Sequence, residues 1–388
     1  MSVLRLRAGE LVEVRSKEEI LATLDKKGRL EELPFMPQMF TYCGRRLRVF
    51  KRAHKTCDTV NDYVGRRMKD AVHLEGMRCD GLAYGGCQAG CLIFWKEAWL
   101  KRVSAPAPRS AGAKLGEPVS AARDSASERC TELDVIAGTK KSAEPGRVSQ
   151  AFVCQATQLP AATEPLPWRE WRQYLEDLTS GNVNLGRMVR GFLYMSYSNR
   201  IIPFRARFSP FLRWLYDRFQ SLWGGIPYPR RQGTIPAGEP TPTLNLNLQP
   251  GEWVRVKSYK AILATCDASD KNRGMKFDAE MVPYCGGIYR VLRRATRIVN
   301  EKTGEIQELK NPCIILDGVV CQSRYSECRL FCPRSIYSYW REIWLERVPE
   351  GEPRGEDRVN KSAASRTAQR TKEITQNRGQ FTRFRHHQ

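Results

Sequence analysis

Long hydrophobic runs are missing from this 388-residue chain. No stretch reaches the roughly 18 apolar residues that a membrane-spanning helix needs. The first residues, Met1 to Arg7, contain no apolar core of the length that a signal peptide requires. We therefore expect a cytoplasmic protein without a transmembrane segment, in which thiols stay reduced and disulfides are rare.

Histidine is scarce, with four residues in the whole chain, and no glycine-rich phosphate loop or dinucleotide fingerprint occurs. Positive charge and cysteine are abundant instead, with a formal net charge of +22 and 13 cysteines. Such a basic surface favours an anionic partner, either a macromolecule such as nucleic acid or a membrane surface. Because disulfides are not expected, the cysteines are interpreted as metal ligands or as buried small residues.

An internal repeat organises the sequence. Gly9-Glu10-Leu11-Val12-Glu13-Val14 matches Gly251-Glu252-Trp253-Val254-Arg255-Val256 at an offset of 242 residues, and the same offset relates Cys79 to Cys321. The offset becomes 245 where Trp95 matches Trp340, so the second copy has gained three residues near its last cysteines. Since insertions usually fall in loops, the cysteine-rich stretch before Trp95 is predicted to be a loop.

The repeat predicts an α+β protein with two small β-rich domains, compatible with SH3-like barrels, on either side of a helical segment rich in arginine and aromatic residues. Strand alternation in Leu11–Val14 and helical periodicity around Trp168 support this division. The expected parts are repeat 1 (1–103), a flexible linker (104–163), the helical basic segment (164–226), a second linker (227–244), repeat 2 (245–349) and a disordered basic tail (350–388).

Comparison of the two copies separates shared cysteines from unshared ones. Cys57 faces Val299, and Cys130 and Cys154 lie between the copies, so they are set aside. Cys87 matches Cys328, or Cys332 if the gap is moved. The predicted metal ligands are the shared cysteines Cys43, Cys79, Cys87, Cys91, Cys285, Cys321, Cys328 and Cys332.

Four thiolates suit Zn²⁺ or an iron–sulfur cluster, because soft sulfur ligands favour both. We therefore expect two metal sites, one for each repeat. Inert buried thiols are the alternative, and redox or catalytic thiols a further one. Catalysis by histidine is disfavoured, because Thr296 and Ile315 replace His54 and His73 in the second copy. Two carboxylate pairs recur as candidate acids or bases, Glu75 with Asp317 and Glu97 with Glu342.

The middle segment carries eleven arginines, no lysine and four acidic residues between Trp168 and Arg231. Arginine interleaved with aromatic residues suits phosphate contact and stacking, or equally a membrane interface. Packing of the aromatic residues onto the two end domains is the other interpretation. The arginines predicted to contact an anionic partner are Arg187, Arg190, Arg205, Arg207, Arg213 and Arg218.

Asn311-Pro312-Cys313-Ile314-Ile315-Leu316 and the segment from Cys332 to Tyr337 resemble a bacterial protein family with duplicated cysteine-containing domains and no assigned activity. The resemblance extends over both repeats and residues 178–183, and it implies no function.

Three functions remain open from the sequence. The first is a metal-binding accessory or interaction protein with an anionic partner. The second is a metalloenzyme or redox enzyme in which one centre is active and the other structural. The third is a metal-free protein that binds nucleic acid or a membrane surface.

Overall fold

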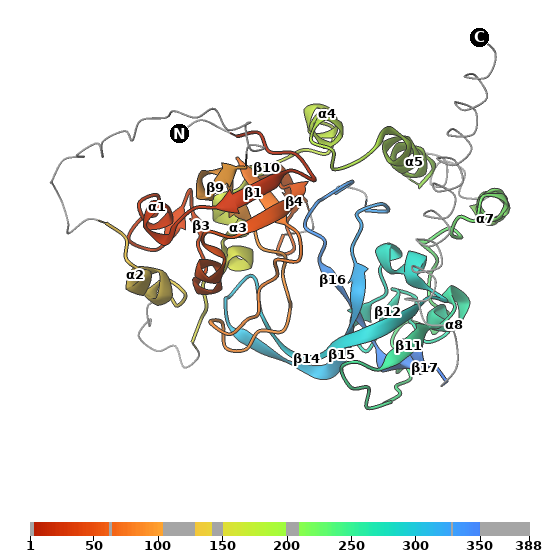
Figure 1. Cartoon of the computed structure of the whole chain (residues 1–388). Helices are drawn as coiled ribbons and strands as arrows, with labels where there is room; N and C mark the ends of the chain where they lie inside the picture. Colours follow the sequence, from red (N-terminus) through yellow and green to blue (C-terminus); the bar gives the residue numbers. More distant parts are fainter. Residues whose placement is uncertain are drawn as a thin grey trace, which may run out of the picture.

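The computed structural model describes residues 4–61, 64–103, 129–141, 150–198, 209–326 and 329–349. It is an α+β protein in which several small antiparallel sheets combine with short helices (Figure 1). Cys328, Arg205, Arg207, the tail 350–388 and most of the predicted first linker lie outside the described residues.

The first repeat is built on a five-stranded antiparallel sheet. Its strand β1 alternates as the sequence predicts, with Val12 and Val14 buried and Leu11 exposed. The strand order is β8-β7-β4-β1-β9, so four strands run as a meander and the fifth returns to pair with the first. The strands are β1 (Leu11–Val14), β4 (Arg46–Arg52), β7 (Ala71–Leu74), β8 (Trp95–Lys96) and β9 (Leu100–Arg102).

The second repeat has a sheet of the same order, β16-β15-β14-β11-β17. Equivalent residues pair in both sheets: Val12 with Leu47 in the first, and Val254 with Tyr289 in the second. Neither sheet closes into a barrel within the described residues. The strands are β11 (Trp253–Val256), β14 (Ile288–Val299), β15 (Ile306–Val320), β16 (Tyr337–Trp340) and β17 (Leu345–Arg347).

Short helices and small sheets complete each repeat. Helix α1 begins with a capping box in which the Ser16 side chain accepts from Glu19 and the Glu19 side chain accepts from Ser16. The helices of the repeats are α1 (Lys17–Leu21), η1 (Pro37–Tyr42), η2 (Glu97–Trp99), α8 (Tyr259–Leu263), η5 (Ala279–Tyr284) and η6 (Glu342–Trp344). The short strands are β2 (Arg29–Leu30), β3 (Leu33–Pro34), β5 (Lys55–Cys57), β6 (Gly65–Arg67), β12 (Lys271–Asn272) and β13 (Met275–Lys276).

Matching tryptophans occupy the two cores. Trp99 and Trp344 are fully buried, and their indole N–H groups donate to Thr23 at 3.1 Å and to Thr265 at 2.9 Å. The acceptor offsets the cost of burying the indole N–H in the core. The same solution in both repeats explains why Thr and Trp persist at these positions.

The hairpin β14–β15 of the second repeat reaches the first repeat. Near its tip, the Gly304 carbonyl accepts from Phe152 N–H at 2.7 Å and the Arg297 carbonyl accepts from Gln88 N–H at 3.0 Å. The second repeat therefore contributes backbone to the surroundings of the first cysteine loop.

Part of the predicted linker is ordered and packed. Residues 129–141 and 150–163 contain α2 (Glu132–Ala137) and α3 (Gln155–Ala162), and β10 (Glu164–Pro165) follows. Val135, Cys154 and Leu159 are buried in the core of the first repeat. The expectation of a flexible linker fails for these residues, because a few well-spaced apolar side chains suffice to dock short helices on an existing core.

The middle segment forms the predicted helices, α4 (Arg172–Thr179), α5 (Leu185–Ser196) and α7 (Ser209–Leu222). In Figure 1 they follow one rim of the molecule, outside the two sheets. Helix α4 is tied to the first repeat by the buried ion pair of Asp177 and Lys55, at 2.5 Å. Burial lowers the pKa of Lys55, and the Asp177 carboxylate opposes this effect.

Candidate functional site

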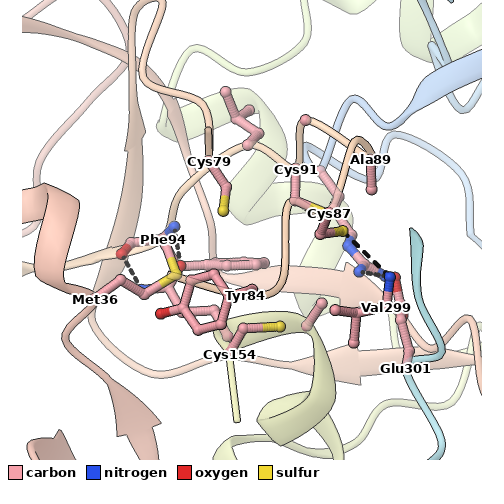
Figure 2. Close-up of a pocket in the computed structure, with 15 residues that line it drawn as sticks. Met36, Cys79, Tyr84, Cys87, Ala89, Cys91, Phe94, Cys154, Val299 and Glu301 are labelled. Atoms are coloured by element: carbon pink, nitrogen blue, oxygen red, sulfur yellow. Dashed lines mark hydrogen bonds and ion pairs between the residues drawn. The ribbon is translucent and has the colours of Figure 1, made fainter. Parts of the chain in front are cut away.

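Four cysteines line one cavity between the first cysteine loop, helix α3 and the hairpin of the second repeat. Figure 2 shows Cys79, Cys87 and Cys91 on the loop side of this space and Cys154 on the opposite side. The thioether of Met36 lines the same cavity. The cavity thus gathers soft sulfur atoms from three separated segments of the chain.

The loop from Cys79 to Cys91 is folded back on itself. Its ends are joined by a hydrogen bond from Cys79 N–H to the Cys91 carbonyl, at 2.8 Å. Gly81 has φ +76°, and a Cβ there would lie 1.8 Å from the Cys87 carbonyl oxygen. Only glycine allows this close approach, which brings Cys87 towards Cys79.

Amide groups surround three of the sulfur atoms. The Gln38 side chain donates to Cys79 Sγ at 3.3 Å, and Val299 N–H donates to Cys87 Sγ at 3.2 Å. Burial raises the pKa of Cys154, and the backbone amides of Thr157 and Ala156 oppose this effect. Donors of this kind stabilise a thiolate more than a thiol, as they do around sulfur ligands of metals.

Burial keeps three of the cavity thiols, those of Cys79, Cys91 and Cys154, protonated near neutral pH. It raises the pKa of Cys79 to about 12 and the pKa of Cys154 to about 11, and it raises the pKa of Cys91 well above its ordinary value. A metal ion that bound here would have to displace a proton from each of these thiols.

The second repeat supplies an ion pair to the cavity wall. Arg334 Nη2 donates to Glu301 Oε1 at 3.0 Å, and both residues line the cavity. Arg334 is buried and also donates to the Cys57 carbonyl at 3.1 Å. The guanidinium is therefore held between the two repeats, close to several thiols.

The structure divides the predicted ligands differently from the sequence interpretation. Cys79, Cys87 and Cys91 come together at the cavity. Cys43 does not line it and directly follows η1, where burial raises the pKa of its thiol and Lys17 opposes this effect. Cys285 likewise follows η5. The Cys-Gly turn introduces a strand in both copies, so the fold alone can account for its recurrence, whether or not the cysteine binds a metal.

Cys332 of the second repeat meets Cys57, an unshared cysteine of the first. Cys332 hydrogen-bonds with Cys57, and Cys321 Sγ lies 3.5 Å from Ser323 Oγ. The hydrogen bond from Cys332 lowers the pKa of Cys57, with further help from Arg334, while burial opposes the shift. Within the ranges described above, no group of three or more His, Cys, Asp or Glu side chains has the spacing that holds a metal ion.

Sequence reasoning missed Cys154 and Cys57. Neither has a counterpart in the other repeat. The fourth cysteine at the cavity is nevertheless Cys154, and not Cys43 as the repeat predicts. The only sequence signal was their residue type, since nothing in residues 104–163 indicated that α3 packs against the first cysteine loop.

The other candidate catalytic residues have structural contacts. His73 is fully buried and its Nδ1 lies 2.8 Å from the Ile93 carbonyl, and burial lowers its pKa to about 3. Glu97 and Glu342 are buried and paired with Arg52 and Arg294. The remaining carboxylate pair, Glu75 and Asp317, is exposed.

The described arginines of the middle segment differ in exposure. Arg190 and Arg218 are exposed, whereas Arg187 donates to the Gln322 carbonyl at 2.7 Å. Arg213 lies over the Tyr228 ring at 5.5 Å. Two of the four are thus free to meet a partner and two help to pack the helices.

The sequence matches no protein-family model and no curated protein, so the chemistry of its own residues is the basis for a functional proposal. Among the helices that the structure describes, none is long and apolar enough to cross a membrane.

Proposed function

We propose that the cysteine-lined cavity of the first repeat binds a thiophilic metal centre, with Cys79, Cys87, Cys91 and Cys154 as ligands. The observation that carries the proposal is the gathering of four thiols in one cavity, three of them from the loop that the repeat selects. Zn²⁺ and an iron–sulfur cluster are the two centres that a set of four thiolates suits.

Amide donors support this assignment over inert packing. Gln38 and Val299 direct N–H groups at Cys79 and Cys87, and such donors favour sulfur in its anionic form. Metal binding requires the four sulfur atoms to converge further, since their present spacing does not meet that of a metal site. The proposal therefore includes closure of the Cys79–Cys91 loop on the metal.

The asymmetry between the repeats favours one centre rather than two. In the second repeat Cys332 hydrogen-bonds with Cys57, and Cys321 lies close enough to Cys57 to feel its charge. Cys285 follows η5, away from this pair. We assign these thiols to contacts within the protein. The net charge of +22 supports an anionic partner as the second part of the proposed function.

Metal content tests the proposal. The full chain is purified without oxygen, reconstituted with Zn²⁺ or with iron and sulfide, and freed of loose metal. We expect about one centre per chain. An iron–sulfur cluster would add an absorbance band at about 400 nm.

Two serine variants provide the comparison. Cys87→Ser removes a cavity thiol and is expected to abolish retention, whereas Cys130→Ser changes a buried thiol that does not line the cavity and retains the centre. Equal retention by both variants, or less than half a centre in the unmodified chain, would refute the proposal.

For the repeats themselves we propose the SH3-like barrel class. The order of a four-stranded meander with the fifth strand returning to the first supports it, as does the 3₁₀ turn before the last strand in both repeats.

A further inference from the structure

Helix α5 presents an apolar stripe away from the protein. Leu185, Val189 and Leu193 recur at every fourth residue, and between 47% and 66% of each side chain is exposed. Spacing of four residues places them on one face of the helix. A stripe of this kind normally faces a core.

Helix α7 repeats the feature. Phe211, Leu215 and Phe219 follow the same spacing and are between 49% and 59% exposed. Arg218 lies on this face, between the apolar side chains, and is itself exposed. We call the six residues Leu185, Val189, Leu193, Phe211, Leu215 and Phe219 the outer apolar face.

The inner sides of these helices are already occupied, so the orientation of the outer apolar face is fixed. Met188, Gly191 and Tyr194 of α5 are buried, and a Cβ on Gly191 would lie 2.5 Å from the Phe331 ring. Stacking of Tyr197 on Tyr216, with ring centroids 5.0 Å apart, joins the end of α5 to α7. Rotation of α5 to hide its stripe would therefore disrupt a packed contact.

Positive charge accompanies this surface. Residues 168–231 hold eleven arginines and four acidic residues, and Asp217 is already paired with Arg231. Within the described ranges neither Arg190 nor Arg218 has an ion-pair partner. The apolar face and its arginines thus present hydrophobic and cationic groups together.

We infer that the outer apolar face docks on an anionic lipid surface, with Arg190 and Arg218 extending to the headgroup phosphates. The inference deepens the anionic-partner part of the proposed function and is independent of the metal centre. Interfacial helices bury apolar side chains at the acyl boundary while arginines reach back to the headgroups. Nucleic acid would leave Leu185, Val189 and Leu193 unburied, and it is therefore the poorer match.

Vesicle flotation of the full chain tests the inference. Vesicles of phosphatidylcholine are compared with vesicles containing roughly a third phosphatidylglycerol, at about 0.1 M salt. We expect binding to the anionic vesicles and little to the neutral ones. Removal of each arginine, in Arg190→Gln and Arg218→Gln, is expected to weaken binding about fivefold.

A matched pair of double variants isolates the apolar contribution. Leu215→Asp with Phe219→Asp changes the outer apolar face, and Leu133→Asp with Ile136→Asp makes the same change on α2, where both residues are also exposed. The first pair is expected to lose binding more than about tenfold and the second to keep it. Circular dichroism checks that both variants remain folded.

The outcomes are distinguishable. Equal loss in both double variants, no binding to anionic vesicles, or binding only to a single-stranded oligonucleotide would overturn the inference. Cys87→Ser is expected to bind vesicles as the unmodified chain does, so failure of the metal proposal leaves this result unaffected.

Discussion

The two repeats share their framework and differ at their cysteine loops. Cys79 and Cys321 are equivalent, yet Cys79 lines a cavity and accepts from Gln38, whereas Cys321 contacts Ser323. Glu280 replaces Gln38 in the second repeat and accepts instead from Tyr325 N–H. Most residues that both copies keep maintain the fold, while the cavity combines shared cysteines with residues that only the first copy has, such as Gln38, or that lie between the copies, such as Cys154.

The buried glutamates test the shared framework and carry the largest expected effect. Glu97 accepts from Arg52 at 2.7 Å and from the backbone N–H groups of Arg5 and Leu6. Glu97→Ala should lower the free energy of unfolding by about 2–4 kcal/mol, because it leaves two backbone amides unpaired. Arg52 keeps its ion pairs with Glu176 and Asp70, so its guanidinium retains partners. Urea unfolding provides the measurement.

Glu342→Ala is the matched change in the second repeat. Its partner Arg294 has a side chain that is 26% exposed, compared with 12% for Arg52. Glu342 also accepts from the backbone N–H groups of Leu246, Asn247 and Leu248, one amide more than Glu97, while water reaches its arginine more easily. We therefore expect a cost similar to that of Glu97→Ala, and a difference of more than about 2 kcal/mol would contradict the shared framework.

Equivalent cysteines test the divergence of the loops. Cys79→Ser should weaken binding of the proposed metal centre about a hundredfold, since it removes one of four thiolates. Cys321→Ser should leave the affinity unchanged. Competition with a chelator of known affinity measures both, and equal losses would assign the centre to both repeats.

His73 makes the first repeat sensitive to acid, because Ile315 occupies its position in the second. Burial lowers the pKa of His73 to about 3 in the folded protein, below the ordinary value of 6.5. Between these values the unfolded chain binds a proton that the folded chain does not, so stability falls as the pH falls. From about pH 7.5 to about pH 5 the loss from His73 is about 2 kcal/mol.

The variant His73→Ile should flatten the dependence of unfolding free energy on pH by that amount. Urea unfolding at several pH values separates this change in slope from any constant loss caused by the missing hydrogen bond to Ile93. An unchanged slope would show that His73 does not carry the acid sensitivity.

Cys57 gives the smallest effect. The second repeat has Val299 at this position, and Cys57→Val keeps a similar volume in the buried site. The free energy of unfolding should change by less than about 1 kcal/mol. A larger loss would show that the hydrogen bond with Cys332 matters to the contact between the repeats.

Much of the framework follows from local sequence. Strand β1 and the loop position of Cys79, Cys87 and Cys91 were predictable, because alternation is a local signal and the shift in the repeat offset marks an insertion. The joining of Cys154 to that loop was not, since it depends on how α3 docks. The closure of the cavity by Val299 could not be predicted from the sequence either, because it depends on the length and direction of the β14–β15 hairpin in space.

The long hairpin also affects the order in which the protein matures during synthesis. Cys79, Cys87 and Cys91 leave the ribosome with the first repeat, but Val299 and Glu301 follow about 200 residues later. At typical rates of about 5–20 residues per second, the cavity stays open for roughly 10–40 s. Its thiols are thus accessible to metal or to oxidants during translation, and arrival of the second repeat ends that period.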